Sequence, residues 1–128
     1  MGFIDHLDHL VLTCVDFEVT KRFYTEVMQM QLETFGEGRI AFRFGNQKIN
    51  VHVRGSEFEP NAHLPVPGAL DLCFIAGVRL DDVVTHLERC NCPIIEGPVE
   101  RTGATQKIRS VYIRDPDFNL IEIADLQE

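Results

Sequence analysis

The chain has 128 residues, a length typical of one domain that can bury its own hydrophobic core. Hydrophobic residues make up 45% and charged residues 25%, which is a globular rather than a disordered composition. The formal net charge of −8 repels phosphate backbones and anionic lipids, so we expect neither nucleic-acid nor membrane partners. The first residues lack a basic segment followed by an apolar stretch, so we expect a cytoplasmic location.

The first half of the chain predicts one strand, one helix and three further strands. Residues 4–14 have the β-branched and apolar content of a strand. Asp16 is a suitable N-cap for a helix over residues 17–28, where apolar residues fall near helical spacing. Three short strands separated by glycine-containing turns are then predicted at residues 31–35, 39–44 and 47–54.

The second half repeats this order after a loop at about residues 55–68, which contains prolines and glutamates and shows no periodicity. A strand is predicted at residues 70–75, and a helix begins at Asp81 or Asp82 and continues to Cys90. Three further strands are predicted at residues 94–95, 107–114 and 119–124.

The repeated order of elements predicts the fold class. We expect an α+β protein in which two βαβββ modules, at about residues 1–55 and 69–128, form a curled mixed sheet with a central cleft. Neither half can bury its own sheet alone, so we treat residues 1–128 as a single domain.

Four cysteines are expected to be reduced, because a disulfide is unusual in the cytosol. Cys14 and Cys73 lie within apolar runs, which predicts that both are buried small hydrophobic residues. Cys90 and Cys92 are one residue apart, closer than the Cys-x-x-Cys spacing of metal and redox motifs.

Strand alternation places particular polar residues on the face opposite the apolar one. In the first half this face carries His9, Asn50 and His52, and in the second half it carries Asp71 and Glu122. Imidazole and carboxylate groups on neighbouring strands are typical of divalent-metal sites. The alternative is the ordinary solvated face of an antiparallel sheet.

Three segments resemble a known family: residues 7–12 (LDHLVL), 23–28 (FYTEVM) and 111–122 (VYIRDPDFNLIE). They resemble the vicinal oxygen chelate superfamily, which includes glyoxalase I, bleomycin- and fosfomycin-resistance proteins, and extradiol dioxygenases. The segment 111–122 is the most specific of the three. Residues 44–73 are similar, within this superfamily, to the glyoxalase domain-containing protein 5 group and to bacterial relatives labelled as virulence proteins.

The resemblance implies two βαβββ modules forming a metal cleft, commonly in a homodimer, with ligands from the first and last strand of each module. Carried over by position, His9 and Glu122 match the residue types of the family. Asp71 stands where a histidine is usual, and Asn50 stands where glyoxalase I has a glutamate. A set of His9, His52 and Glu122 is an alternative, with the two histidines and one carboxylate of non-haem iron oxygenases.

Substrate-side candidates are also implied. Tyr112 resembles a tyrosine that contacts substrate in the fosfomycin-resistance relatives, and the alternative is an ordinary half-buried strand residue. Glu122 is the candidate for the glutamate that moves the proton in isomerase members. The candidates for binding an anionic, oxygen-rich substrate are Lys48, Asn50, Arg101 and Arg109.

Three functions follow from this resemblance. The first is a lyase or isomerase of the glyoxalase-like class that uses zinc, nickel, manganese or ferrous iron to chelate adjacent oxygens of a small metabolite. The second is a non-haem Fe(II) extradiol-type dioxygenase. The third is a metal-free protein that sequesters a ligand, as bleomycin-resistance proteins do, and the departures at Asn50 and Asp71 keep it open.

Overall fold

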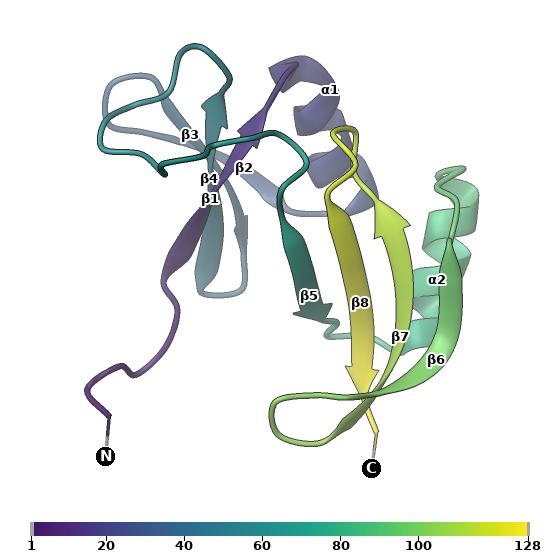
Figure 1. The fold of residues 1–128 in the computed structure, drawn as a ribbon. Coiled ribbons are helices and arrows are strands. Elements are labelled where there is room, and N and C mark those ends of the chain that lie inside the picture. The colour runs from purple at the N-terminus through teal and green to yellow at the C-terminus, as the bar shows by residue number, and fades with distance from the viewer. Residues whose placement is uncertain (1, 128) are drawn as a thin grey trace. The chain divides into compact units, whose positions relative to one another are not determined.

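The computed structural model describes residues 2–127 of the chain (Figure 1). The chain divides into two compact units, Met1–Pro67 and Gly68–Glu128, here called unit 1 and unit 2. Each unit contains a four-stranded mixed sheet that is not closed, and in each the order is strand, helix and three strands. The predicted α+β fold with two βαβββ modules is therefore confirmed.

Unit 1 follows the predicted order closely. Its sheet has the order β1-β4-β3-β2, with β1 parallel to β4 and the other neighbours antiparallel. The first strand begins at His9, later than the predicted residue 4. The elements are β1 (His9–Cys14), α1 (Phe17–Arg22), η1 (Phe23–Val27), β2 (Gln31–Phe35), β3 (Arg39–Phe44) and β4 (Gln47–Val53).

The helix of unit 1 begins where its capping residue predicts. The Asp16 carboxylate accepts hydrogen bonds from the backbone N–H groups of Glu18 at 3.0 Å and Val19 at 3.3 Å. These bonds satisfy two of the N–H groups that a first helical turn leaves without intrahelical partners. The helix then continues as a short π-helical segment, η1, which carries the buried Phe23 and Tyr24.

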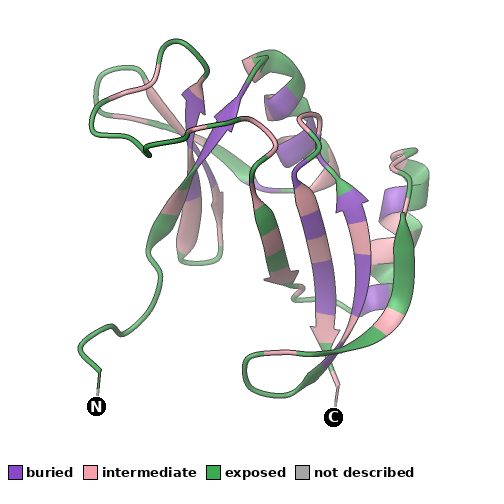
Figure 2. Cartoon of the chain, viewed as in Figure 1, coloured by how far each residue is buried: buried purple, intermediate pink, exposed green. Residues whose placement is uncertain are grey.

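The core of unit 1 lies between the helical segment and one face of the sheet. Tyr24 of η1 stacks on Phe42 of β3 with ring centroids 5.1 Å apart, and Leu12 and Ile49 are fully buried. Figure 2 colours the buried segments of the chain purple. Burial of one such side chain stabilises a fold by roughly 1.5–3 kcal/mol. The opposite face of this sheet, which we call the open face of unit 1, is left for polar residues.

Unit 2 repeats the arrangement with the strand order β5-β8-β7-β6, in which β5 is parallel to β8. Its helix packs on β7 and β8, and its core contains Leu80, Leu87, Val111 and Ile121. Figure 2 shows buried segments on the helix and on these two strands. The elements are β5 (Asp71–Ile75), α2 (Leu80–Arg89), β6 (Glu96–Thr102), β7 (Lys107–Arg114) and β8 (Leu120–Leu126).

The start of α2 corrects a prediction. The helix begins at Leu80, ahead of Asp81 and Asp82, and its preceding residue, Arg79, makes no side-chain capping bond. The Leu80 N–H instead donates to the carboxylate of Asp125 on β8 at 2.9 Å. A cap supplied from a distant strand leaves no local sequence signal.

The position of the sixth strand also differs from the prediction. The predicted strand at residues 94–95 is wrong, because these residues precede β6, which begins at Glu96. Most of β6 is polar and exposed at the sheet edge, so burial imposes no apolar alternation on it. The apolar pair at residues 94–95 was the only signal of a strand in this region.

The strand β6 contains a β-bulge. Glu96 pairs with Tyr112 and Val99 pairs with Ser110, so β6 has one more residue than β7 between these two pairs. Gly97 lies in the bulge with φ +102, and a Cβ atom built there would lie 2.3 Å from the Ser110 carbonyl oxygen. Only glycine fits this position without a shift of the backbone.

A buried polar turn joins β7 to β8. The Asp115 carboxylate accepts from the backbone N–H of Asn119 at 2.9 Å and from its side-chain amide at 2.7 Å. The Asn119 side-chain oxygen in turn accepts from the Leu70 N–H at 2.8 Å, which ties the turn to the start of β5. Among residues 2–127, no helix is long and apolar enough to cross a membrane.

Candidate functional site

The open face of unit 1 brings together the sequence candidates on β1 and β4. The parallel register pairs His9 with Lys48, Val11 with Asn50 and Thr13 with His52. Because Leu12 and Ile49 occupy the helix-covered face, these pairs lie on the opposite one.

His9 has the local environment of a metal-binding histidine. Its Nδ1 lies 2.8 Å from a carboxylate oxygen of Asp8, and this hydrogen bond is the leading cause of a lowered pKa for the Asp8 carboxyl. A proton held on Nδ1 leaves Nε2 with a lone pair available to a ligand. Histidines that bind metals usually donate their other ring N–H to a carboxylate or carbonyl in this way.

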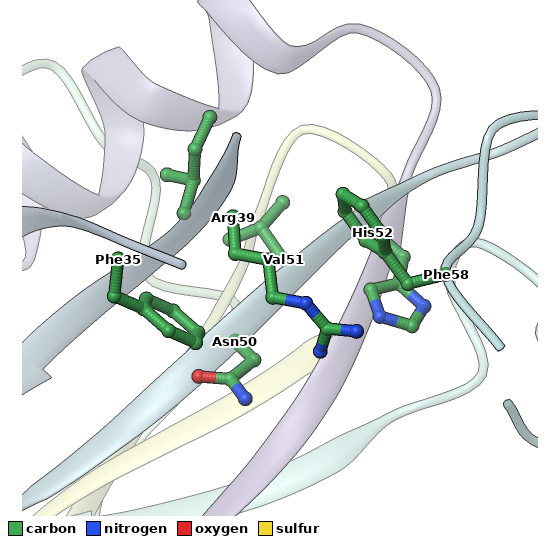
Figure 3. A pocket seen from close by; sticks show the side chains of 7 residues that line it. Phe35, Arg39, Asn50, Val51, His52 and Phe58 are labelled. Carbon is green, nitrogen blue, oxygen red and sulfur yellow. The ribbon is translucent and has the colours of Figure 1, made fainter. Parts of the chain in front are cut away.

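A small pocket lies beside Asn50 and His52 on the same face (Figure 3). Its volume is about 170 Å³, including its open mouth. The six lining residues labelled in Figure 3 are Phe35, Arg39, Asn50, Val51, His52 and Phe58.

Polar atoms of this pocket lack partners in the described chain, residues 2–127. His52 is only 6% exposed, and its Nδ1 is buried without a hydrogen bond, as is Oδ1 of Asn50. The Arg39 guanidinium, which extends toward both side chains in Figure 3, likewise has no hydrogen-bond or ion-pair partner there. An unpaired buried polar atom is costly, so such a cluster is suited to a ligand or to ordered water.

Aromatic rings hold the pocket in shape. Arg39 packs over the ring of Phe58, 4.5 Å from its centroid, and the same ring meets His52 edge to face at 5.7 Å. Burial lowers the pKa of His52, the Arg39 charge lowers it further, and Glu57 opposes the shift. The neutral form of the imidazole is therefore the predominant one at pH 7.

The open face of unit 2 carries acidic and thiol groups. Glu122 on β8 lies between its register partners Cys73 on β5 and Tyr112 on β7, and it accepts a 2.6 Å hydrogen bond from the Ser110 hydroxyl. Partial burial of its sulfur atom and the neighbouring Glu122 raise the pKa of the Cys73 thiol to about 11. The residue as a whole is exposed, so the prediction that Cys73 is buried is wrong, whereas Cys14 is buried as expected.

Tyr112 on this face accepts a hydrogen bond from an arginine that is itself in an ion pair. The Arg101 Nε donates to the Tyr112 hydroxyl oxygen at 3.0 Å, and a terminal nitrogen of Arg101 lies 2.5 Å from the Glu96 carboxylate. Because the tyrosine oxygen accepts from Arg101, its own O–H is free to donate to a ligand. Asp71 lies on β5 and is exposed.

The cations predicted to bind an anion have other neighbours. Arg109 contacts the carboxylate of Asp81 at 3.2 Å and that of Asp125 at 3.9 Å. Lys48 lies over the ring of Phe35, 3.6 Å from its centroid, at the side of the unit 1 pocket. Arg101 is paired with Glu96. The guanidinium beside the unpartnered groups of the unit 1 pocket is that of Arg39, which the sequence did not predict.

The sequence candidates are thus distributed over both units. His9, Lys48, Asn50 and His52 belong to unit 1, and Asp71, Arg101, Arg109, Tyr112 and Glu122 belong to unit 2. Within either unit, the described residues contain no group of three or more His, Cys, Asp or Glu side chains arranged to hold a metal ion. The donor chemistry of His9 and of Glu122 nevertheless suits a divalent ion, because each is oriented by a hydrogen bond of its own.

Two residues of the pocket, Arg39 and Phe58, were not predicted from the sequence. Extending the alternation to β3 would have identified Arg39, because Ala41, two residues along, pairs with Asn50 on the open face. Phe58 lies in the aperiodic loop that follows β4, where no periodic signal indicates its position.

Residues 6–123 match the model of the Glyoxalase/Bleomycin resistance protein/Dioxygenase superfamily, and the chain belongs to this superfamily. It is 54% identical over 121 residues to virulence protein STM3117 of Salmonella typhimurium, covering 94% of this chain and 84% of that protein. The crystal structure of STM3117 matches with a TM-score of 0.96 at 52% identity, covering 98% of this chain and 100% of that chain.

A second relative, glyoxalase domain-containing protein RDO1 of Mycosarcoma maydis, is 50% identical over 122 residues, which cover 95% of this chain and 69% of that protein. Lactoylglutathione lyase from Agrobacterium tumefaciens, 22% identical with a TM-score of 0.72, shares the fold over 97% of this chain and 96% of that chain. The antibiotic-binding protein TnmS3 from Streptomyces sp. CB03234, 19% identical with a TM-score of 0.77, shares it over 99% and 100%. One fold therefore serves both an enzyme and a binding protein.

Proposed function

We propose that this protein is a divalent-metal-dependent lyase or isomerase of the glyoxalase-like class that acts on a small oxygen-rich metabolite. Membership of the superfamily supports the class. The observation that carries the metal dependence is the 2.8 Å hydrogen bond from His9 Nδ1 to Asp8, which leaves Nε2 available as a donor. As part of the proposal, the chain acts as one domain in a cytoplasmic homodimer.

The residues proposed as metal donors are His9 in unit 1 and, in unit 2, Glu122 and Asp71. His52 stays a candidate, but the neighbouring Arg39 charge opposes the binding of a cation at its Nδ1. The ligand set, the metal and the substrate are all proposals that rest on residue chemistry and on the family resemblance.

The residues of unit 2 support proton transfer. A divalent ion, when bound, supplies polarisation of adjacent substrate oxygens. Glu122 is the group proposed to move the proton, and hydrogen bonds with the Ser110 hydroxyl and the Cys73 thiol orient its carboxylate. The free O–H of Tyr112, oriented by Arg101, is proposed to donate to a substrate oxygen.

The proposal is tested by the metal content of the untagged protein, measured by inductively coupled plasma mass spectrometry. We expect about one ion per chain in the wild type, with loss of more than roughly nine-tenths of it in His9→Gln and Glu122→Gln, because each change removes a donor. Glu88→Gln, on the exposed surface of α2, is the matched control and should retain the ion.

Other outcomes of this measurement favour the other functions. Ferrous iron together with oxygen consumption would favour the dioxygenase. A wild-type protein that takes up none of zinc, nickel, manganese or ferrous iron would reject both enzymes. It would favour the ligand-sequestering protein, for which the pocket formed by unit 1 alone is the supporting observation.

A further inference from the structure

The unit 1 pocket combines a cation, an acceptor and a neutral imidazole that share no hydrogen bonds. Arg39 offers guanidinium donors that no group among residues 2–127 uses. The Asn50 side-chain oxygen is a buried acceptor without a donor. His52 is only 6% exposed, and its Nδ1 has no hydrogen-bond partner.

We propose that this pocket binds a small hydroxycarboxylate, with the carboxylate on Arg39 and the hydroxyl of the adjacent carbon on Asn50 and His52. The proposal names the substrate class of the enzyme proposed above and therefore rests on that function.

The carboxylate follows from the unpaired guanidinium. The planar donors of arginine match the two oxygens of a carboxylate, and such charge-assisted bonds are about twice as strong as neutral ones. The guanidinium packs against the Phe58 ring, 4.5 Å from its centroid, and extends toward Asn50 and His52 in Figure 3. Nearly all of the pocket's volume of about 170 Å³ lies at its open mouth, so only a group of a few atoms, such as a hydroxyl, can enter while the rest of the ligand stays at the mouth.

The hydroxyl follows from the unpaired acceptor. A carboxylate alone cannot satisfy Asn50 Oδ1, because both groups accept hydrogen bonds. A hydroxyl on the adjacent carbon can donate to this oxygen and accept from the imidazole. An ammonium group could also donate, but it would bring a second positive charge next to Arg39.

The test is a titration of the full-length, chelator-treated protein with lactate, followed by NMR shifts of the Asn50 and His52 signals. Because metal is absent, a failure here is distinct from a failure of the metal-dependent function. We expect saturable lactate binding that Arg39→Gln weakens at least about tenfold. Arg54→Gln, an exposed change of equal charge just after β4, should bind lactate like the wild type.

Matched ligands separate the hydroxyl from the charge. Propionate lacks the hydroxyl and should bind roughly tenfold more weakly than lactate, as should inorganic phosphate and alanine. Asn50→Leu should abolish the advantage of lactate over propionate while leaving propionate binding unchanged, which a merely structural effect would not do.

Several results would overturn the proposal. One is that lactate binds wild type and Arg39→Gln equally well. Another is that phosphate or propionate binds as strongly as lactate. A third is that no binding is seen, as for a pocket filled by ordered water alone, or that the shifts are confined to residues outside the pocket.

Discussion

Units 1 and 2 repeat one order of strands and helices, yet their open faces differ in charge and in how their polar atoms are satisfied. The face of unit 1 presents an unpaired Arg39 guanidinium beside buried groups without partners. The face of unit 2 presents Glu122, Cys73 and Asp71, and its Arg101 is held by an acidic neighbour and by a tyrosine. One scaffold therefore carries a face with an unpaired guanidinium and a face with several acidic groups.

The difference shows which polar groups serve the fold and which are left for a ligand. Where a polar group has a partner within its own unit, as in the Ser110–Glu122 bond, the partner fixes its orientation. Where a buried group has none, as at His52 Nδ1, its hydrogen bond is left to be made with something outside the chain.

The largest effect is expected at the turns that lead into the last strand of each unit. Asn119→Ala removes the hydrogen bonds to Leu70 and Asp115 in a buried turn, and should lower the free energy of unfolding by about 3 kcal/mol. Asn46→Ala, at the exposed turn before β4, should lower it by less than about 0.5 kcal/mol. Urea unfolding of both variants measures the difference, and equal losses would show that the two turns are equivalent.

A smaller effect is expected on the reactivity of Cys73. With a pKa of about 11, only about one thiol in a thousand is ionised at pH 8, so this exposed thiol should react slowly with iodoacetamide. Glu122→Gln removes a negative neighbour, lowers the thiol pKa part of the way back and should accelerate alkylation roughly fivefold to tenfold. Peptide-level mass spectrometry measures the rate at this residue.

Asp71→Asn is the control for this effect. Asp71 also raises the pKa of Cys73, but it does so less than Glu122 and less than burial. We expect a clearly smaller acceleration in this variant, and equal rates in the wild type and in Glu122→Gln would contradict the proximity of thiol and carboxylate.

The smallest effect is expected in the titration of His52. Its pKa in the folded protein lies below 6.5, with burial as the larger cause, so Arg39→Gln should raise the pKa by a fraction of a unit and leave it below 6.5. NMR of the imidazole ring protons measures both values. Arg54→Gln is the control, because Arg54 is not a cause of this shift.

The sign of the stability change follows from the same pKa. The unfolded chain protonates His52 first as the pH falls below 6.5, so the contribution of this residue to stability is present above 6.5 and is lost as the pH falls further. Arg39→Gln should weaken this dependence. A wild-type imidazole titrating at or above 6.5 would mean that the pocket is more hydrated than the structure indicates.

Local patterns predicted most of the fold. The strands Gln31–Phe35 and Arg39–Phe44 have the predicted bounds, and Asp16 caps its helix, because turns and caps act on neighbouring residues. The start of α2 was missed because its first N–H is bound by Asp125 of a distant strand. The edge strand β6 was missed because exposure removes the apolar pattern on which the prediction depends.

The candidate site was predictable in its faces but not in its contacts. Alternation placed His9, Asn50 and His52 on one face, as the register of β1 and β4 has them. It could not show that Arg109 contacts Asp81, a partner 28 residues away. Nor could it identify Phe58, because a loop residue reaches a pocket through the path of the backbone and not through periodicity.

The bulge in β6 has a consequence for comparing related sequences. Glu96 and Arg101 are five residues apart, a separation that puts side chains on opposite faces of a regular strand, yet they form an ion pair. The extra residue around Gly97 restores them to one face. A relative with a one-residue deletion at this position would keep both residue types in an alignment and still lose the pair, so gaps in β6 carry more information than substitutions do.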